Sequence, residues 1–302
     1  MNPRTGLGLV ETALLAAVAD LGGTAGAGHL RSDRVLEWME REHAVGPRYA
    51  YAVLVDLAVP WRLHLPLLDV EGNTGSQHGD PPADAQYTRV RLTPVGELAV
   101  AAERGELGPV PLGLVEGSLY REGRVPPFDP RHVVTALTDG SGDAGAPSLP
   151  TGGEVGGDVA GLLAGRAVRL QLGCAIVREP GALVVTEVPL GVGIDLLERS
   201  LVNRVAASRG PRHRDHLPGP PIEPVPAPVV EVRDETSMLS GVRVVLRLAE
   251  GADPDEAERW ARYAWPVTTE VDCLLPQPMP TRLRDWDRGD GSGLVALAGL
   301  LA

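Results

Sequence analysis

Tyr87 has the surroundings that most favour chemistry in this 302-residue chain. It follows a segment rich in glycine and proline, residues 71–84, which predicts a loop that presents the phenol. A phenol ordinarily has a pKa of about 10, so it is a nucleophile near neutral pH only where cations stabilise the phenolate. Arg89 and Arg91 follow closely and could contact phosphate. The alternative is a loop tyrosine that packs its ring, beside two solvated arginines on a strand.

Two other clusters contain groups that could bind a ligand. Residues 209–216 hold three arginines and two histidines, but they lie in a proline-rich stretch, where a solvated surface is the favoured interpretation. The run from Asp285 to Asp290 weakly resembles a calcium-binding loop. Gly289 occupies its third ligand position and no glutamate closes the set, so we reject a calcium site.

The two cysteines, Cys174 and Cys273, lie in apolar stretches without a CxxC motif or a neighbouring histidine. This spacing predicts neither a disulfide framework nor a zinc site, and we expect no metal or cofactor bound by this chain. Residues 1–21 carry Glu11 and Asp20 within their apolar pattern, so they are predicted to be neither a signal peptide nor a membrane span. We therefore expect a cytoplasmic protein that does not enter a membrane.

The composition is that of a folded, acidic protein. The formal net charge is −12 and the pI is near 5.1, with 43% hydrophobic and 23% charged residues. All 28 basic side chains are arginine, which we attribute to GC-rich codons rather than to function. The length allows two domains with substantial cores, and the negative charge opposes non-specific binding to nucleic acid.

The first third of the chain is predicted to be largely helical. Apolar residues recur at three- and four-residue spacing, and capping or breaking residues mark the ends. The expected helices are Leu7–Leu21, one that Ser32 caps, 48–59 after the Gly46-Pro47 break, and one from Thr93-Pro94 to about Arg104. The second and third of these, joined by a short turn, form a helix-turn-helix candidate.

The second half is predicted to mix strands and helices, with no internal repeat. β-branched residues favour strands, and Glu179-Pro180-Gly181 joins two of them as a hairpin. The expected elements are strands at 167–178, 183–190, 229–233 and 242–248, helices at 194–207 and from Asp253-Pro254 to about Tyr263, and an exposed proline-rich connection at 209–228. The predicted fold class is therefore α+β.

The segment Leu67–Leu92 carries a specific family motif. Its run from Asp69 through Gly79-Asp80 to Tyr87-Thr88 resembles the pattern D-G-x-G-N-x-G-S-x-x-G-D-x-x-A-x-x-R-Y-T-E-x-R-L. This pattern belongs to the DNA breakage-rejoining A subunits of type IIA topoisomerases, the gyrase A and topoisomerase IV A family. Further similarity extends from about residue 6 to about 288, at Gly6–Gly22, Arg31–Asp69, Pro147–Val155, Thr186–Pro189, Arg233–Met238 and Gly241–Val245.

The resemblance implies a winged-helix domain over 1–132, a tower-like α/β domain over 133–275 and a C-terminal tail over 276–302. The coiled coil, dimer gate and DNA-wrapping domain of the family are expected to be absent, which predicts a monomer or weak homodimer. Tyr87 would form a 5′-phosphotyrosyl link to DNA. Mg²⁺ and ATP would be bound by a B-type partner subunit. The residues implied to contact DNA are His43, Arg48, Arg89, Arg91 and Leu149, the last as a wedge between base pairs or, alternatively, as a core leucine.

Basic residues of the family pattern are missing around this tyrosine. Gln86 replaces the arginine before it, Val45 replaces the second histidine of H-P-H-G, and Asp56 replaces an arginine late in the recognition helix. The basic helix pattern G-L-K-P-V-H-R-R is replaced at Gly8, Glu11, Thr12 and Ala13. Residues 1–92 hold eight Arg against eleven Asp or Glu, so we expect Glu11 and Asp56 to repel phosphate and duplex binding to be weak.

Two hypotheses of different classes follow. The first is an enzyme, a minimal DNA-breaking subunit that borrows its metals and ATPase from a partner. The second is a catalytically inert paralogue that acts as a binding or regulatory protein. The motif around Tyr87 supports the first, and the lost basic residues support the second.

Overall fold

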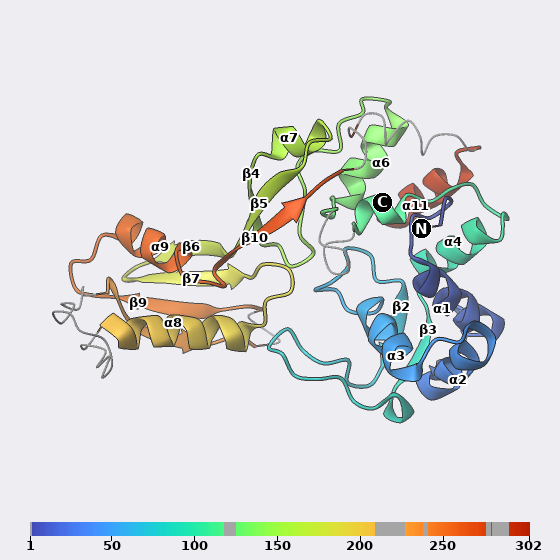
Figure 1. The fold of residues 1–302 in the computed structure, drawn as a ribbon, viewed down its shortest axis with the longest axis horizontal. Coiled ribbons are helices and arrows are strands. Elements are labelled where there is room, and N and C mark those ends of the chain that lie inside the picture. Colours follow the sequence, from blue (N-terminus) through green and yellow to red (C-terminus); the bar gives the residue numbers. More distant parts are fainter. Residues whose placement is uncertain (1, 118–124, 209–226, 238–240, 276–278, 280–289) are drawn as a thin grey trace, which may run out of the picture.

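The computed structural model describes residues 2–117, 125–208, 227–237, 241–275, 279 and 290–302. Helices and antiparallel sheets are mixed along the chain, which confirms the predicted α+β class. Figure 1 shows an elongated molecule with a mainly helical lobe at one end and a sheet with two helices at the other. None of the described helices combines the length and the apolar character that a membrane crossing needs.

The first lobe packs four helices against a small sheet with strand order β1-β3-β2. Thr93 caps α4 by accepting a hydrogen bond from Gly96 N, and Pro94 follows at the first helical position, as predicted. Ala44, in the left-handed conformation, ends α2. The elements are α1 (Leu9–Asp20), β1 (Leu30–Arg31), α2 (Ser32–His43), α3 (Pro47–Asp56), β2 (Leu68–Glu71), β3 (Arg89–Leu92) and α4 (Pro94–Glu103).

The middle region has its own core around the fully buried Phe128. A three-stranded antiparallel sheet with order β10-β5-β4 lies beside three helices. Asp129 caps α6 by accepting hydrogen bonds from Arg131 N and His132 N. The elements are α5 (Leu112–Val115), α6 (Pro130–Thr138), β4 (Glu154–Gly157), α7 (Val159–Leu163), β5 (Val168–Gly173) and β10 (Thr268–Cys273).

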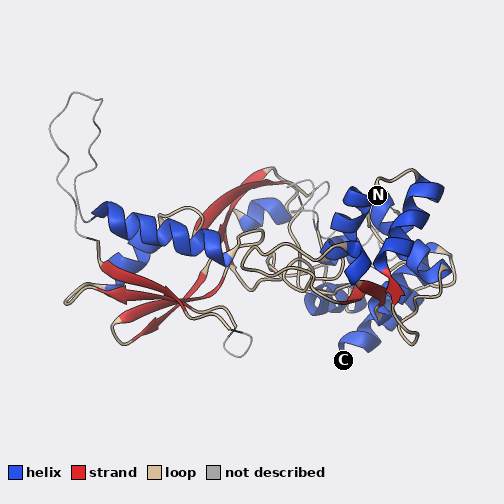
Figure 2. Cartoon of the chain, turned by 90° about the horizontal axis from the view of Figure 1, so that it is seen from below, coloured by secondary structure: helices blue, strands red, loops and turns tan. Residues whose placement is uncertain are grey.

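The second lobe is a four-stranded antiparallel sheet, order β6-β7-β9-β8, with two helices packed on it. Figure 2 shows the longer helix lying along the sheet. The predicted hairpin is confirmed: β6 and β7 are joined at Gly181, whose φ of +72° suits glycine. The elements are β6 (Ala175–Glu179), β7 (Ala182–Glu187), α8 (Ile194–Ser208), β8 (Val229–Asp234), β9 (Val244–Leu248) and α9 (Pro254–Arg262).

The last helix, α11 (Ser292–Leu301), returns to the first lobe and contacts α4 and α6. Leu297 is buried in the first-lobe core, and Gly108 N donates a hydrogen bond to Ser292 Oγ at 2.8 Å. The predicted C-terminal tail therefore contributes to folded structure over these residues.

The single predicted strand at 167–178 is wrong, because the run forms two strands in different sheets. β5 ends at Gly173 and β6 begins at Ala175, and between them Cys174 N bonds instead to Val267 O. The predicted domain boundary at 132/133 falls within α6, and its position stays a prediction. The basic cluster at 209–216, most of the proline-rich connection and residues 285–289 lie outside the described residues.

Candidate active site

Tyr87 is exposed at the end of a short helical turn, between β2 and β3. It closes the 3₁₀ turn η1 (Ala85–Tyr87), where its N–H donates to Asp84 O at 2.8 Å. The residue is 71% exposed, so its phenol is not packed against the core as the alternative interpretation required. Its hydroxyl is open to a ligand as large as a duplex.

Thr88 anchors this tyrosine to the two helices of the first lobe. Thr88 is fully buried, and its Oγ1 donates to Ser32 Oγ of α2 at 2.9 Å. Ser32 N in turn donates to Thr88 O at 3.1 Å. From α3, the hydroxyl of Tyr51 donates to Ala83 O at 2.6 Å. The segment before the strand is thus fixed at both ends, while Tyr87 itself points to solvent.

We expect Thr88→Val to destabilise the protein by about 1–2 kcal/mol, because the buried hydroxyl of Ser32 loses its partner while the side-chain volume is kept. Urea unfolding followed by circular dichroism measures this. The matched control is Thr135→Val at an exposed position of α6, which should change stability by less than about 0.5 kcal/mol. Equal stability of the Thr88 and Thr135 variants would contradict the anchoring role.

Glycines of the matched motif have steric reasons in this loop. Gly72 has a φ of +114°, and a Cβ on it would lie 3.1 Å from Tyr87 O. Gly75 has a φ of +86°, and a Cβ there would lie 2.7 Å from Asp80 O. Each has a backbone conformation that L side chains rarely adopt and a close backbone neighbour. The motif therefore encodes the shape of the loop that carries Tyr87.

Arg89 and Arg91 differ in their surroundings. Arg91 Nε donates to Asp69 Oδ2 at 2.9 Å, and the same oxygen lies 3.1 Å from His29 Nε2. His29 Nδ1 is 3.2 Å from Glu71 Oε1, which extends the network along β2. Arg91 is therefore already paired with a carboxylate. Arg89 is exposed and makes no ion pair within the described part of the chain, so it is the cation near Tyr87 that a phosphate could recruit.

His43 and Arg48 flank the turn between α2 and α3, and both are exposed. Neither forms an ion pair with any described residue. Leu149, by contrast, is 3% exposed and lies in the middle-region core. Its surroundings are those of the core leucine that was the alternative interpretation, and its side chain does not face a ligand in this structure.

Two acidic replacements in the basic pattern have structural roles. Glu11 is buried and accepts a hydrogen bond from Gly8 N at 2.8 Å, as the capping box of α1. Asp56 forms an ion pair with Arg62. The expectation that Glu11 faces and repels phosphate is therefore wrong, because its carboxylate is committed to the start of the helix.

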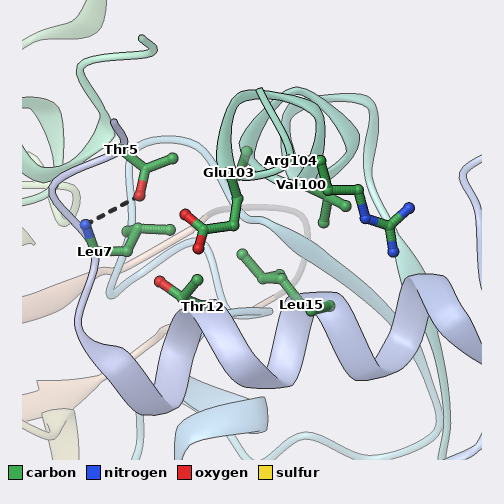
Figure 3. A pocket seen from close by; sticks show the side chains of 9 residues that line it. Thr5, Leu7, Thr12, Leu15, Val100, Glu103 and Arg104 are labelled. Carbon is green, nitrogen blue, oxygen red and sulfur yellow. Dashed lines mark hydrogen bonds between the residues drawn. The ribbon is translucent and has the colours of Figure 1, made fainter. Parts of the chain in front are cut away.

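Thr12, another replaced position, faces a small cavity between α1 and α4 (Figure 3). Its Oγ1 is buried and has no hydrogen-bond partner among the described residues. The cavity measures about 30 Å³, enough for one or two water molecules but not for a substrate. This position too belongs to the interior.

Glu116 is a buried acid that the sequence analysis missed. It follows α5, and its two carboxylate oxygens accept hydrogen bonds from His64 N and Leu65 N, each at 2.9 Å. Burial raises the pKa of Glu116 to about 8, although the two backbone N–H groups act in the opposite direction. Burial also lowers the pKa of His64, whose ring lies 3.0 Å from Ser148 O. A charged residue at the end of an apolar run was the available signal.

The described residues contain no group of three or more His, Cys, Asp or Glu side chains that could hold a metal ion. Both cysteines are buried and unpaired. Burial raises the pKa of Cys174 to about 12 and that of Cys273 to about 11, so both thiols stay protonated near neutral pH.

Similarity to known proteins is concentrated in one family. No family model matches the chain. It is 41% identical over 93 residues, 30% of its length, to the topoisomerase 4 A protein of Neisseria gonorrhoeae. It is 27% identical over 293 residues to the DNA gyrase A protein of Haloquadratum walsbyi and 28% identical over 296 residues to that of Dehalogenimonas lykanthroporepellens, in each case covering 84% of this chain. The chain spans 12%, 32% and 34% of these three relatives, respectively.

Proposed function

Since the chain is a gyrase A-like member of the type IIA topoisomerase family, we propose that it presents Tyr87 for breakage and rejoining of a DNA strand. The observation that carries the proposal is the exposed phenol of Tyr87, fixed beside the buried Thr88. The first lobe would correspond to the family's winged-helix domain and the second lobe to its tower. Exposed His43, Arg48 and Arg89 would contact the duplex backbone.

The proposed reaction exchanges one phosphodiester for another. Tyr87 Oη attacks phosphorus, the bond from phosphorus to the 3′ oxygen breaks, and a 5′-phosphotyrosyl link forms. The phenol proton is lost and the leaving 3′ oxygen gains one, so the reverse attack by the 3′ hydroxyl restores the strand. Charge that develops on the phosphate needs nearby cations. Arg89 can supply one, whereas Gln86 cannot.

Metal chemistry is assigned in this proposal to a second protein. Mg²⁺ and ATP would be bound by a B-type partner subunit, and strand passage would depend on that partner. For this chain itself we propose a monomer or a weak homodimer. Sedimentation at nanomolar concentration tests this, and a tight dimer would contradict it.

An inert binding or regulatory protein is the second candidate function. The observation that favours it is the internal pairing of basic side chains. In the first lobe Arg91 is paired with Asp69, and Arg62 with Asp56. The second lobe repeats the pattern with Arg178–Glu258, Arg243–Glu179, Arg247–Glu231 and Arg262–Glu154, at 2.7–3.0 Å. Few arginines are left to grip a duplex.

A denaturant-resistant protein–DNA adduct tests the enzyme proposal, sought with and without a type II topoisomerase B-type subunit. Tyr87→Phe should abolish the adduct, because it removes the attacking oxygen. Gln86→Arg should increase its yield about tenfold, by adding a cation beside the phosphate. Tyr263→Phe is the matched control, since Tyr263 is 84% exposed in the second lobe. An adduct that survives Tyr87→Phe would rule out this nucleophile, and no adduct in any variant would leave the inert protein.

Duplex binding is expected to be weak and only slightly dependent on salt. With most arginines paired internally, we expect a Kd above about 10 µM near physiological salt and a salt slope of about two or three phosphate contacts. Fluorescence anisotropy on a duplex of about 30 base pairs, across a salt series, measures both. Arg89→Gln should lower the slope by about one contact, whereas Arg91→Gln should not. Submicromolar binding with a steep slope would contradict this prediction.

A further inference from the structure

The loop that carries Tyr87 touches the second lobe. Gln77 O accepts a hydrogen bond at 3.0 Å from the N–H of Ile194, the first residue of α8. Next to it, His78 Nδ1 lies 3.5 Å from Asp234 Oδ2 at the end of β8. In Figure 1 this loop, between β2 and β3, extends from the first lobe toward the end of α8. Residues about 155 positions apart in sequence therefore meet.

The contact is close on both sides. Gly79, with a φ of +106°, has so little space that a Cβ on it would lie 3.0 Å from Asp195 Oδ1. A Cβ on Gly193 would lie 2.8 Å from the same oxygen and 3.4 Å from His78 O. The start of α8 and the tip of the loop are thus packed against each other without room for additional atoms.

Hydrogen bonds inside the loop connect this tip to the tyrosine. Ser76 N donates to Asp80 O at 3.2 Å, and Ser76 Oγ donates to Asp80 Oδ2 at 2.6 Å. Farther along, Ala83 N donates to Asn73 O at 2.9 Å, and Tyr87 N donates to Asp84 O. A displacement of residues 77–79 would therefore be passed through paired backbone segments to the turn that holds Tyr87.

We propose that the second lobe positions Tyr87, with His78 and Asp234 as positioning residues at the contact between the lobes. The first lobe fixes the base of the loop through Thr88 and Tyr51, and the second lobe fixes its tip through Ile194 and Asp234. The phenol is held in place only while both attachments are made. The catalytic part of this inference rests on the proposed function of Tyr87.

Hydrogen–deuterium exchange of the full chain tests the attachment without any reaction. His78→Ala and Asp234→Ala should each speed exchange of amides within residues 73–87 about fivefold, the effect of losing one modest polar contact. His78→Asn should restore the slow rate, because its amide keeps a donor where Nδ1 lies. Glu231→Gln is the control: it removes ion pairs on the same strand, to Arg233 and Arg247, and should leave the loop unchanged. Unchanged loop exchange in both alanine variants would overturn the proposal.

Adduct yield in the Gln86→Arg background provides the second readout. His78→Ala should lower the yield about fivefold while duplex affinity stays the same, because position rather than binding is changed. His78→Asn should recover it. A yield that His78→Ala leaves unchanged would overturn the positioning of the reaction. Complete absence of adduct would count against the proposed function of Tyr87, and the exchange rates would still decide whether the second lobe holds the loop.

Discussion

Gly293→Val is expected to destabilise the protein by about 3 kcal/mol or more. Gly293 is buried in α11, where a Cβ would lie 2.2 Å from Gly108 O and 2.5 Å from Pro109 O. Both neighbours are backbone atoms, so relief would require the 108–109 segment or the whole helix to move. Such a shift would separate Leu297 from the first-lobe core. Urea unfolding followed by circular dichroism measures the loss.

The same helix offers a matched control, because a Cβ on Gly299 would meet nothing within 4 Å. Gly299→Val makes the same chemical change on the exposed side, and we expect it to be neutral or slightly stabilising, since glycine is a poor helix former. Equal destabilisation by both variants would show that helix propensity rather than packing is responsible. A neutral Gly293→Val would contradict the close contact.

The return of α11 to the first lobe was beyond what the sequence could predict. Its residues from Ser292 to Leu301 include no charge and hence no amphipathic pattern that would show which side is buried. Its contact depends on glycines separated by about 185 positions, a relation that local periodicity does not contain. The tail was therefore predicted from resemblance alone, which says nothing of where a segment packs.

Local signals succeeded where a short stretch determines the structure. Thr93-Pro94 marked the start of α4 correctly because capping needs only neighbouring residues. The run 167–178 misled because Cys174 is as apolar as a strand residue, although Cys174 N bonds to Val267 O, far along the chain. Its place between two sheets is a tertiary property.

The candidate site divides in the same way. The loop and the exposed Tyr87 followed from turn residues and the motif. Glu11 could not be assigned correctly from its charge, because a carboxylate that caps a helix and one that faces a ligand are identical in sequence. The pairing of Arg91 with Asp69 depends on the register of β2 against β3, which sequence reading left open. Which arginines remain available to a duplex is thus a structural question.

Stability is expected to fall as pH rises from about 5 to about 8, because of Glu116. Its pKa is raised from the ordinary value of 4.5 to about 8 in the folded state, so the folded protein binds more protons than the unfolded chain in this window. The stabilisation is complete below pH 4.5 and is lost as pH passes through about 8. One pKa unit corresponds to about 1.4 kcal/mol, so the loss between these limits is on the order of 3 kcal/mol.

Urea unfolding of the wild type and of Glu116→Gln at several pH values between 5 and 8 tests this. Glutamine does not titrate, and its amide would face one of the two backbone donors, His64 N or Leu65 N. The variant should therefore be less stable than the wild type at pH 5 by about 1–3 kcal/mol and should lack the downward slope, so that the two curves converge toward pH 8. His64, whose pKa is lowered, contributes the opposite trend below about 6.5 in both proteins, which leaves the interval from 6.5 to 8 as the cleanest comparison. Parallel curves for wild type and variant across that interval would mean that Glu116 is ionised in the folded state and that its two backbone hydrogen bonds outweigh its burial.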